Sequence, residues 1–217
     1  MAKAQKTASR PAPRLYLVAP PAAEPAALGR RLETMLAAAA DVAAVLLRLP
    51  QAGERELIDY AKAIAPSVQG AGAALLLDGH PELVARAGAD GVHLTGIAAF
   101  TAAVAALKPE RIAGAGGLHT RHDAMLAGER GADYLMFGEP DERARRFDVV
   151  CERVAWWAEL FESPCVGYAE SLDEVSALVA AGADFVALGA LVFSDSGPPS
   201  AIMQAAAALL SAPEPVK

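Results

Sequence analysis

The sequence is poor in cysteine and aromatic residues, and it lacks an unbroken apolar segment of membrane-spanning length. Two cysteines, Cys151 and Cys165, are too few for a disulfide framework or a structural zinc cluster, so we expect buried thiols in a reducing compartment. The apolar runs are rich in alanine and interrupted by glycine, proline or charge, which argues against a membrane span. The basic start has no apolar core behind it and so does not resemble a secretory signal. These absences predict a cytoplasmic protein.

Positive charge is also in deficit. The chain has 19 Lys+Arg against 26 Asp+Glu, a formal net charge of -7. Such a surface repels phosphate backbones and anionic lipid heads, so we expect neither nucleic acid nor a membrane as partner. The 217 residues contain no Pro/Ser-rich internal linker. We therefore expect one domain over 14–211, flanked by a disordered tail over 1–13 and a short tail over 212–217.

Short apolar runs of strand length alternate with longer segments of helical period. The expected strands cover 15–19, 42–47, 72–77, 91–94, 111–115, 134–137, 165–167 and 185–188. The expected helices cover 24–39, 53–66, 81–87, 97–107, 121–130, 142–161, 171–181 and 199–210. Eight strands, each followed by a helix, predict a single-domain (β/α)8 TIM barrel. A flavodoxin-like open sheet would leave three strands unused.

An aspartate recurs before every second expected strand. Asp41, Asp90, Asp133 and Asp184 each lie between a helix end and a strand start, about two β/α units apart. Glycine precedes three of these segments and can turn the chain at a helix end. Since these positions are at the amino ends of strands, away from a barrel's active site, we interpret the aspartates as structural.

Chemistry is expected at the carboxyl ends of the strands. Arg48 follows the strand 42–47 and would meet either a bound anion or an internal carboxylate. Asp78 follows the strand 72–77 and would either hold a metal or cap the next helix. His93, within the strand 91–94, is interpreted as a satisfied core histidine.

Glycines follow two of the later strands. Gly116 and Gly117 precede a helix that Thr120 would cap, and they allow close approach of an anion. His119 lies just before that cap and is our candidate general acid or base. Gly189 and Ala190, after the strand 185–188, are the second candidate phosphate-binding segment.

Two further features have open interpretations. Glu139-Pro140-Asp141 and the arginines at 143, 145 and 146 form either a charged first helical turn or a cluster that faces a diphosphate. One of the adjacent Trp156 and Trp157 must face away from the barrel. An outward tryptophan is typical of a subunit contact, so a homodimer is one expectation.

The order of several motifs resembles the thiamine phosphate synthase superfamily, which includes the thiazole tautomerases. The motifs are Arg48, Asp78, Ala89-Asp90-Gly91-Val92-His93-Leu94, His119-Thr120, Gly131-Ala132-Asp133-Tyr134 with Gly138, and Ala181-Gly182-Ala183-Asp184. The resemblance implies a phosphorylated small-molecule ligand. For the synthase it implies Mg²⁺, with Asp78 as metal ligand, gripping a pyrimidine diphosphate that is attacked by a thiazole phosphate.

The sequence departs from the family pattern where that reaction needs charge. The lysine expected after Arg48 is absent, and Thr95-Gly96-Ile97-Ala98 replaces the segment with the second metal carboxylate. Glu139-Pro140-Asp141 replaces a Thr-x-Thr-Lys loop, and Tyr168-Ala169-Glu170 replaces a Gly-Gly phosphate cradle. The resemblance therefore leaves three hypotheses: a binding protein or altered enzyme with a degenerate diphosphate site, an active synthase that uses Arg48, and a tautomerase-like enzyme that uses His119.

Overall fold

The computed structural model describes residues 11–39, 41–140, 145–194 and 200–211. Most of the expected amino-terminal tail and all of 212–217 lie outside these ranges. Among the described residues, no helix is both long and apolar enough to cross a membrane.

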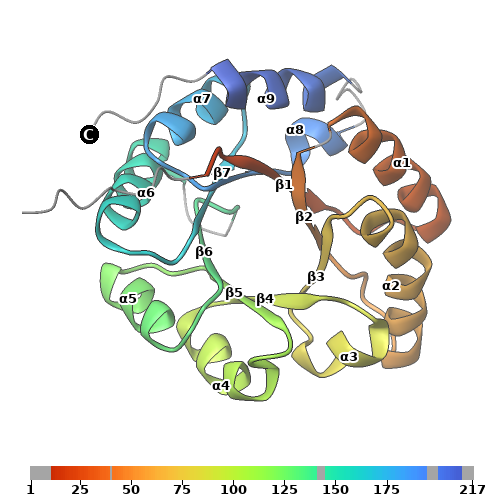
Figure 1. The fold of residues 1–217 in the computed structure, drawn as a ribbon. Coiled ribbons are helices and arrows are strands. Elements are labelled where there is room, and N and C mark those ends of the chain that lie inside the picture. The colour runs from red at the N-terminus through yellow and green to blue at the C-terminus, as the bar shows by residue number, and fades with distance from the viewer. Residues whose placement is uncertain (1–10, 40, 141–144, 195–199, 212–217) are drawn as a thin grey trace, which may run out of the picture.

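Parallel strands close into the predicted (β/α)8 barrel, with each strand paired to its neighbours in chain order and β8 paired to β1. Figure 1 shows the strands as an inner ring surrounded by helices. The strands are β1 (Arg14–Ala19), β2 (Val42–Leu47), β3 (Ala74–Asp78), β4 (Gly91–Thr95), β5 (Ile112–Gly116), β6 (Tyr134–Phe137), β7 (Cys165–Ala169) and β8 (Phe185–Leu188).

The outer ring follows the expected order with three differences. It contains α1 (Pro25–Ala38), α2 (Glu54–Gln69), the 3-10 turn η1 (Pro81–Leu83), α3 (Val84–Ala87), α4 (Ile97–Leu107), α5 (Arg121–Glu129), α6 (Phe147–Leu160), α7 (Leu172–Ala180), α8 (Ala190–Phe193) and α9 (Ser200–Ser211). Helix α2 continues past Pro66 because Val68 is buried in the core. Helix α6 starts at Phe147 rather than 142, and α8 was not expected.

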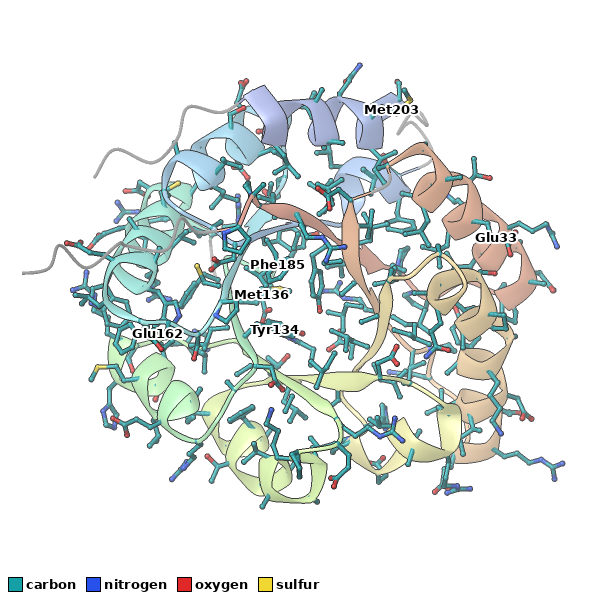
Figure 2. The ribbon with its side chains drawn as sticks, viewed as in Figure 1. Glu33, Tyr134, Met136, Glu162, Phe185 and Met203 are labelled. Carbon is teal, nitrogen blue, oxygen red and sulfur yellow. The ribbon has the colours of Figure 1, made fainter. Side chains whose placement is uncertain are left out.

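Two hydrophobic layers stabilise the barrel. The larger layer lies between strands and helices, while alternate strand residues fill the barrel itself. The inner layer contains Tyr16, Val18, Ala44, Leu46, Leu76, Tyr134, Met136, Val166, Tyr168 and Ala187. Figure 2 shows Tyr134, Met136 and Phe185 toward the middle of the barrel, with Glu33, Glu162 and Met203 on its outside. Burial on both faces explains why the strands are apolar throughout.

The recurring aspartates have structural roles, as the sequence predicts, and three of them join neighbouring strands. Asp90 accepts the backbone N–H of Leu75 at 2.7 Å, and Asp133 accepts that of Ala113 at 2.7 Å. Asp184 accepts the N–H of Cys165 at 2.8 Å, from the strand before its own. Asp41 differs, because its carboxylate pairs with the side chain of Arg14. The first three are therefore structural ties at the amino end of the barrel.

Replacing Asp133 with alanine should destabilise the barrel by about 2 kcal/mol, because the N–H of Ala113 then loses its acceptor in a partly buried position. Lys108, which also bonds Asp133, would lose its partner. Urea unfolding measures the change. Asp41→Ala is the matched control and should cost under about 1 kcal/mol, because it removes one exposed ion pair. Equal losses for the two variants would contradict a special role for the backbone tie.

Candidate functional site

Arg48 and Asp78 meet at the carboxyl end of the barrel. Arg48 Nε lies 3.3 Å from Asp78 Oδ2, and the side chains are 40% and 28% exposed. Arg48 Nε is buried but makes no hydrogen bond among the described residues, so this contact is an ion pair without hydrogen-bond alignment. The sequence left Arg48 to meet either a bound anion or an internal carboxylate. In the structure it contacts the internal carboxylate of Asp78.

A chain of buried polar side chains crosses the barrel interior below the mouth. The hydroxyls of Tyr16 and Tyr134 are 2.8 Å apart, and Tyr134 Oη lies 3.0 Å from His93 Nδ1. His93 Nε2 lies 3.1 Å from Oε2 of Glu139, which follows β6. His93 is 1% exposed, and both of its ring nitrogens have partners. The interpretation of His93 as a satisfied core histidine is confirmed, with the addition that it holds a carboxylate.

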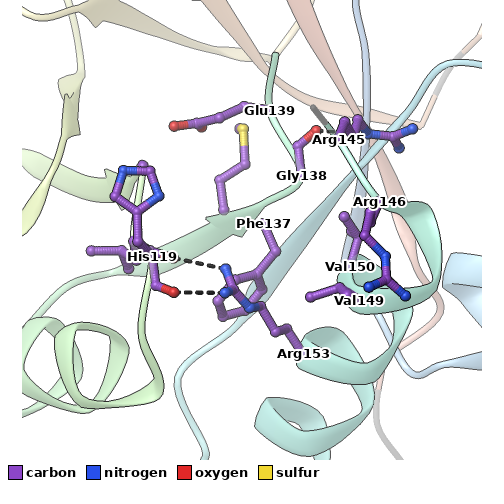
Figure 3. Close-up of a pocket in the computed structure, with 12 residues that line it drawn as sticks. His119, Phe137, Gly138, Glu139, Arg145, Arg146, Val149, Val150 and Arg153 are labelled. Carbon is purple, nitrogen blue, oxygen red and sulfur yellow. Dashed lines mark hydrogen bonds between the residues drawn. The ribbon is translucent and has the colours of Figure 1, made fainter. Parts of the chain in front are cut away.

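A cavity of about 230 Å³ opens beside Glu139, between the loops that follow β5 and β6. Figure 3 shows the carboxylate of Glu139 and the ring of His119 at one side of it, and arginines at the other. Its lining comprises Gly117, Leu118, His119, Met136, Phe137, Gly138, Glu139, Arg145, Arg146, Val149, Val150 and Arg153. The cavity thus combines an acid–base end, apolar walls and a basic end.

The predicted residues after β5 lie at this cavity. His119 is exposed, and its backbone oxygen accepts a hydrogen bond from Arg153. Thr120 caps α5 as expected, since its hydroxyl accepts the N–H of Asp123 at 3.0 Å. A Cβ on Gly116 would lie 2.3 Å from Glu139 Oε2. The space at Gly116 is therefore filled by a protein carboxylate, and anion binding there remains a prediction.

The arginines after β6 are largely committed to protein partners. Arg145 bonds both oxygens of Glu174, one oxygen of Glu170, and the backbone oxygens of Gly138 and Tyr168. These contacts use every N–H of its guanidinium. They also hold Arg145 ahead of α6, where the sequence predicts helix. Residue 143 lies outside the described residues.

The other two arginines at this end differ in their partners. Arg146 pairs with Asp148, and both side chains are exposed. Arg153 donates to the backbone oxygens of Leu118 and His119. Its described partners are therefore uncharged carbonyls, and they leave its positive charge uncompensated at the basic end of the cavity.

The side chain of Tyr168 reaches Gly189, in the second segment predicted to bind a phosphate. Its side chain is 3% exposed, and a Cβ on Gly189 would lie 2.0 Å from its hydroxyl oxygen. Burial raises the pKa of Tyr168, while Arg48 and the backbone N–H of Ala190, which bonds the phenol oxygen, act in the opposite direction. Glu170 faces away from this contact, because its half-exposed carboxylate pairs with Arg145 at 3.3 Å.

Among the described residues, the side chains at the mouth do not form a ready magnesium site. Mg²⁺ in proteins takes carboxylate oxygens, but Asp78 is paired with Arg48 and Glu139 is bonded to His93. In the described ranges, no group of three or more His, Cys, Asp or Glu side chains could hold a metal. The residues at the end of β4 and directly after it, Thr95-Gly96-Ile97-Ala98, supply no carboxylate either.

Sequence reasoning did not select the centre of this site. The sequence places Glu139 in a charged turn or a diphosphate-facing cluster, and it places Tyr16 and Tyr134 in strands, with Tyr134 also in a motif of the resemblance. Their inward direction follows from the barrel's register, in which Gly114 pairs with Tyr134. The available signal was a carboxylate placed between Gly138 and Pro140 at the end of a buried strand.

A closed parallel barrel with polar side chains gathered at the carboxyl ends of its strands defines a TIM barrel, a fold whose small-molecule sites lie at that end. The family model for thiamine monophosphate synthase matches residues 15–192, and the chain belongs to this family. It is 36% identical over 200 residues to the thiamine-phosphate synthase of Rhodospirillum centenum, covering 87% of this chain and 94% of the relative. It is 35% identical over 212 residues to that of Hyphomonas neptunium, covering 92% and 95%.

Solved structures show the same fold. The thiamine phosphate pyrophosphorylase of Pyrococcus furiosus superposes with a TM-score of 0.74 at 20% identity, over 91% of this chain and 96% of the other. The (S)-3-O-geranylgeranylglyceryl phosphate synthase of Thermoplasma acidophilum reaches a TM-score of 0.65 at 15% identity, over 91% and 93%. At these identities the likeness concerns the fold alone. The family membership rests on the sequence relatives.

Proposed function

We propose that this chain keeps the family's barrel and small-molecule site but does not couple a pyrimidine diphosphate to a thiazole phosphate. The observation that carries the proposal is the buried ring of Tyr168, whose hydroxyl oxygen would lie 2.0 Å from a Cβ on Gly189. In the family pattern, this backbone helps to surround a substrate phosphate. A phosphate beside Gly189 would have to displace this buried side chain.

The need for positive charge beside the departing diphosphate supports the same conclusion. Coupling requires a cation to stabilise the departing diphosphate. Arg48 is engaged with Asp78, and the donors of Arg145 are used by Glu174, Glu170 and backbone oxygens. Neither arginine is free to replace the missing family lysines.

A coupling assay with purified protein, Mg²⁺ and both substrates should give no thiamine phosphate above background. Calorimetry should show weak or no binding of thiazole phosphate. The double change Tyr168→Gly with Glu170→Gly should improve that binding by opening the space beside Gly189.

The single change Glu170→Gly is the matched control. It should not improve phosphate binding, because Glu170 faces Arg145 rather than Ala190. Thiazole phosphate bound tightly by the unaltered protein, at low micromolar concentration, would overturn the proposal.

A second candidate is the active synthase itself. It is favoured by the 36% identity to a curated thiamine-phosphate synthase over 87% of this chain. Turnover in the same coupling assay would establish it. Binding of Mg²⁺ would then require Asp78 to leave Arg48.

A further inference from the structure

The outer face of α5 and α6 exposes large apolar side chains. Of the three large hydrophobic residues that are exposed within the described ranges, two lie here: Leu160 on α6 is 62% exposed, and Met125 on α5 is 39% exposed. Trp156 on α6 adds a half-buried indole ring. Figure 1 shows the two helices side by side in the outer ring. Apolar side chains grouped in this way are typical of a surface that another molecule covers.

Contacts between the two helices show that these side chains form one patch. Arg121, in the first turn of α5, reaches both Glu152 and the ring of Trp156. Two turns further along α5, a Cβ on Gly128 would lie 2.8 Å from the ring of Trp157. The helices therefore run alongside each other, and the residues one turn beyond Arg121 and one turn beyond Trp156 are neighbours. The α5–α6 patch consists of Arg121, Met125, Glu152, Trp156 and Leu160.

Trp156 is held in place before any partner arrives. Its ring lies edge-on to Trp157, with centroids 5.7 Å apart, and edge-on to Phe161 at 5.4 Å. The guanidinium of Arg121 packs over it at 4.9 Å. A side chain that is already ordered loses little conformational entropy when it is covered. Since tryptophan, methionine and arginine are enriched in protein–protein interfaces, the composition of the patch fits a protein partner.

The charges of the patch match a second copy of this chain. With a formal net charge of -7, two copies repel each other over most of their surfaces, so a contact between them needs opposite charges locally. The patch carries both signs, because the exposed side chains of Arg121 and Glu152 lie next to each other at 2.8 Å. A two-fold axis through the patch makes it self-complementary, since the basic side of each copy then faces the acidic side of the other.

We propose that the α5–α6 patch is the interface of a symmetric homodimer, in which Arg121 of each copy pairs with the partner's Glu152 and both copies of Trp156 and Leu160 are covered. The helices have 9 and 14 residues and are about 14 and 21 Å long. Such an interface is small, so we expect a micromolar dissociation constant. The proposal goes beyond the proposed function, which concerns the mouth of the barrel.

Sedimentation equilibrium of the full chain between about 1 and 200 μM, a range that spans micromolar dissociation constants, tests the proposal. The mass should rise from monomer to dimer and no further, because a two-fold interface closes. Leu160→Glu should raise the dissociation constant by about 10-fold or more, because it places a charge in the apolar part of the interface. The matched control Met203→Glu alters the third exposed hydrophobic residue, on α9, and should leave the dissociation constant unchanged.

Two charge reversals test the pairing of Arg121 with the partner's Glu152. Either Arg121→Glu or Glu152→Arg alone places like charges across the two-fold axis, and each should weaken association by about 10-fold or more. An equimolar mixture of the two variants should associate again, because every pair across the axis then joins opposite charges. Both variants lack the ion pair within one chain, so recovery on mixing measures the contact between chains.

Monomer mass at every concentration would overturn the proposal, and so would a mass that keeps rising beyond the dimer. Equal effects of Leu160→Glu and Met203→Glu, or no recovery on mixing the charge reversals, would also contradict it. Thermal melting followed by circular dichroism verifies that each variant is folded. The mass is independent of the coupling assay, so thiamine phosphate formation would overturn the proposed function and leave the dimer interface standing.

Discussion

Replacing Trp157 with alanine should destabilise the barrel by about 3–5 kcal/mol, the range for deleting a large buried aromatic side chain. Trp157 is 0% exposed and stacks on Phe161 with ring centroids 4.0 Å apart. Its indole N–H donates to the backbone oxygen of Ser163 at 2.7 Å. The substitution therefore leaves a cavity and removes the donor for that carbonyl. Urea unfolding measures the loss.

Trp156→Ala is the control from the adjacent position. Trp156 is half-buried, and its ring packs against Arg121 at 4.9 Å and edge-on to Trp157. We expect a loss of about 1–2 kcal/mol, from one cation–π contact and partial burial. A larger loss at Trp156 than at Trp157 would contradict the packing described here. This pair satisfies the expectation that one tryptophan faces outward, while the homodimer stays a prediction.

Replacing Gly91 with alanine should have the second large effect, at about 3 kcal/mol or more, because it overpacks two neighbouring strands. A Cβ at this position would lie 2.2 Å from the backbone oxygen of Ile112 and 2.5 Å from its Cβ. Backbone cannot rotate out of the way as a flexible side chain can. β4 would have to separate from β5, moving His93 with it.

Gly53→Ala serves as the comparison for Gly91. Gly53 precedes α2, and an added Cβ there would approach no atom closer than the carboxylate of Glu56, at 3.9 Å. We expect a loss under about 1 kcal/mol, the difference between glycine and alanine at a helix cap. Chemical unfolding of both variants checks the contrast. Similar stability for the two would show that the β4–β5 spacing is adjustable.

The sequence by itself determined the barrel, because each β/α unit carries its own signal. Apolar runs of strand length, helical periods and glycine-aspartate junctions depend on residues close together in the chain. The capping of α5 by Thr120 is predictable for the same reason. The structure differs from the sequence prediction where contacts distant in the chain set the end of a helix. At Val68, burial in the core extends α2 beyond Pro66.

Only the tertiary structure decided what the mouth of the barrel contains. Arg48 and Asp78 are predictable as residues at strand ends, but their pairing depends on adjacent strands. The chain from Tyr16 through Tyr134 and His93 to Glu139 joins β1, β4 and β6, with up to 118 residues between bonded partners. Local sequence contains no information about such a contact, because closure of the barrel creates it.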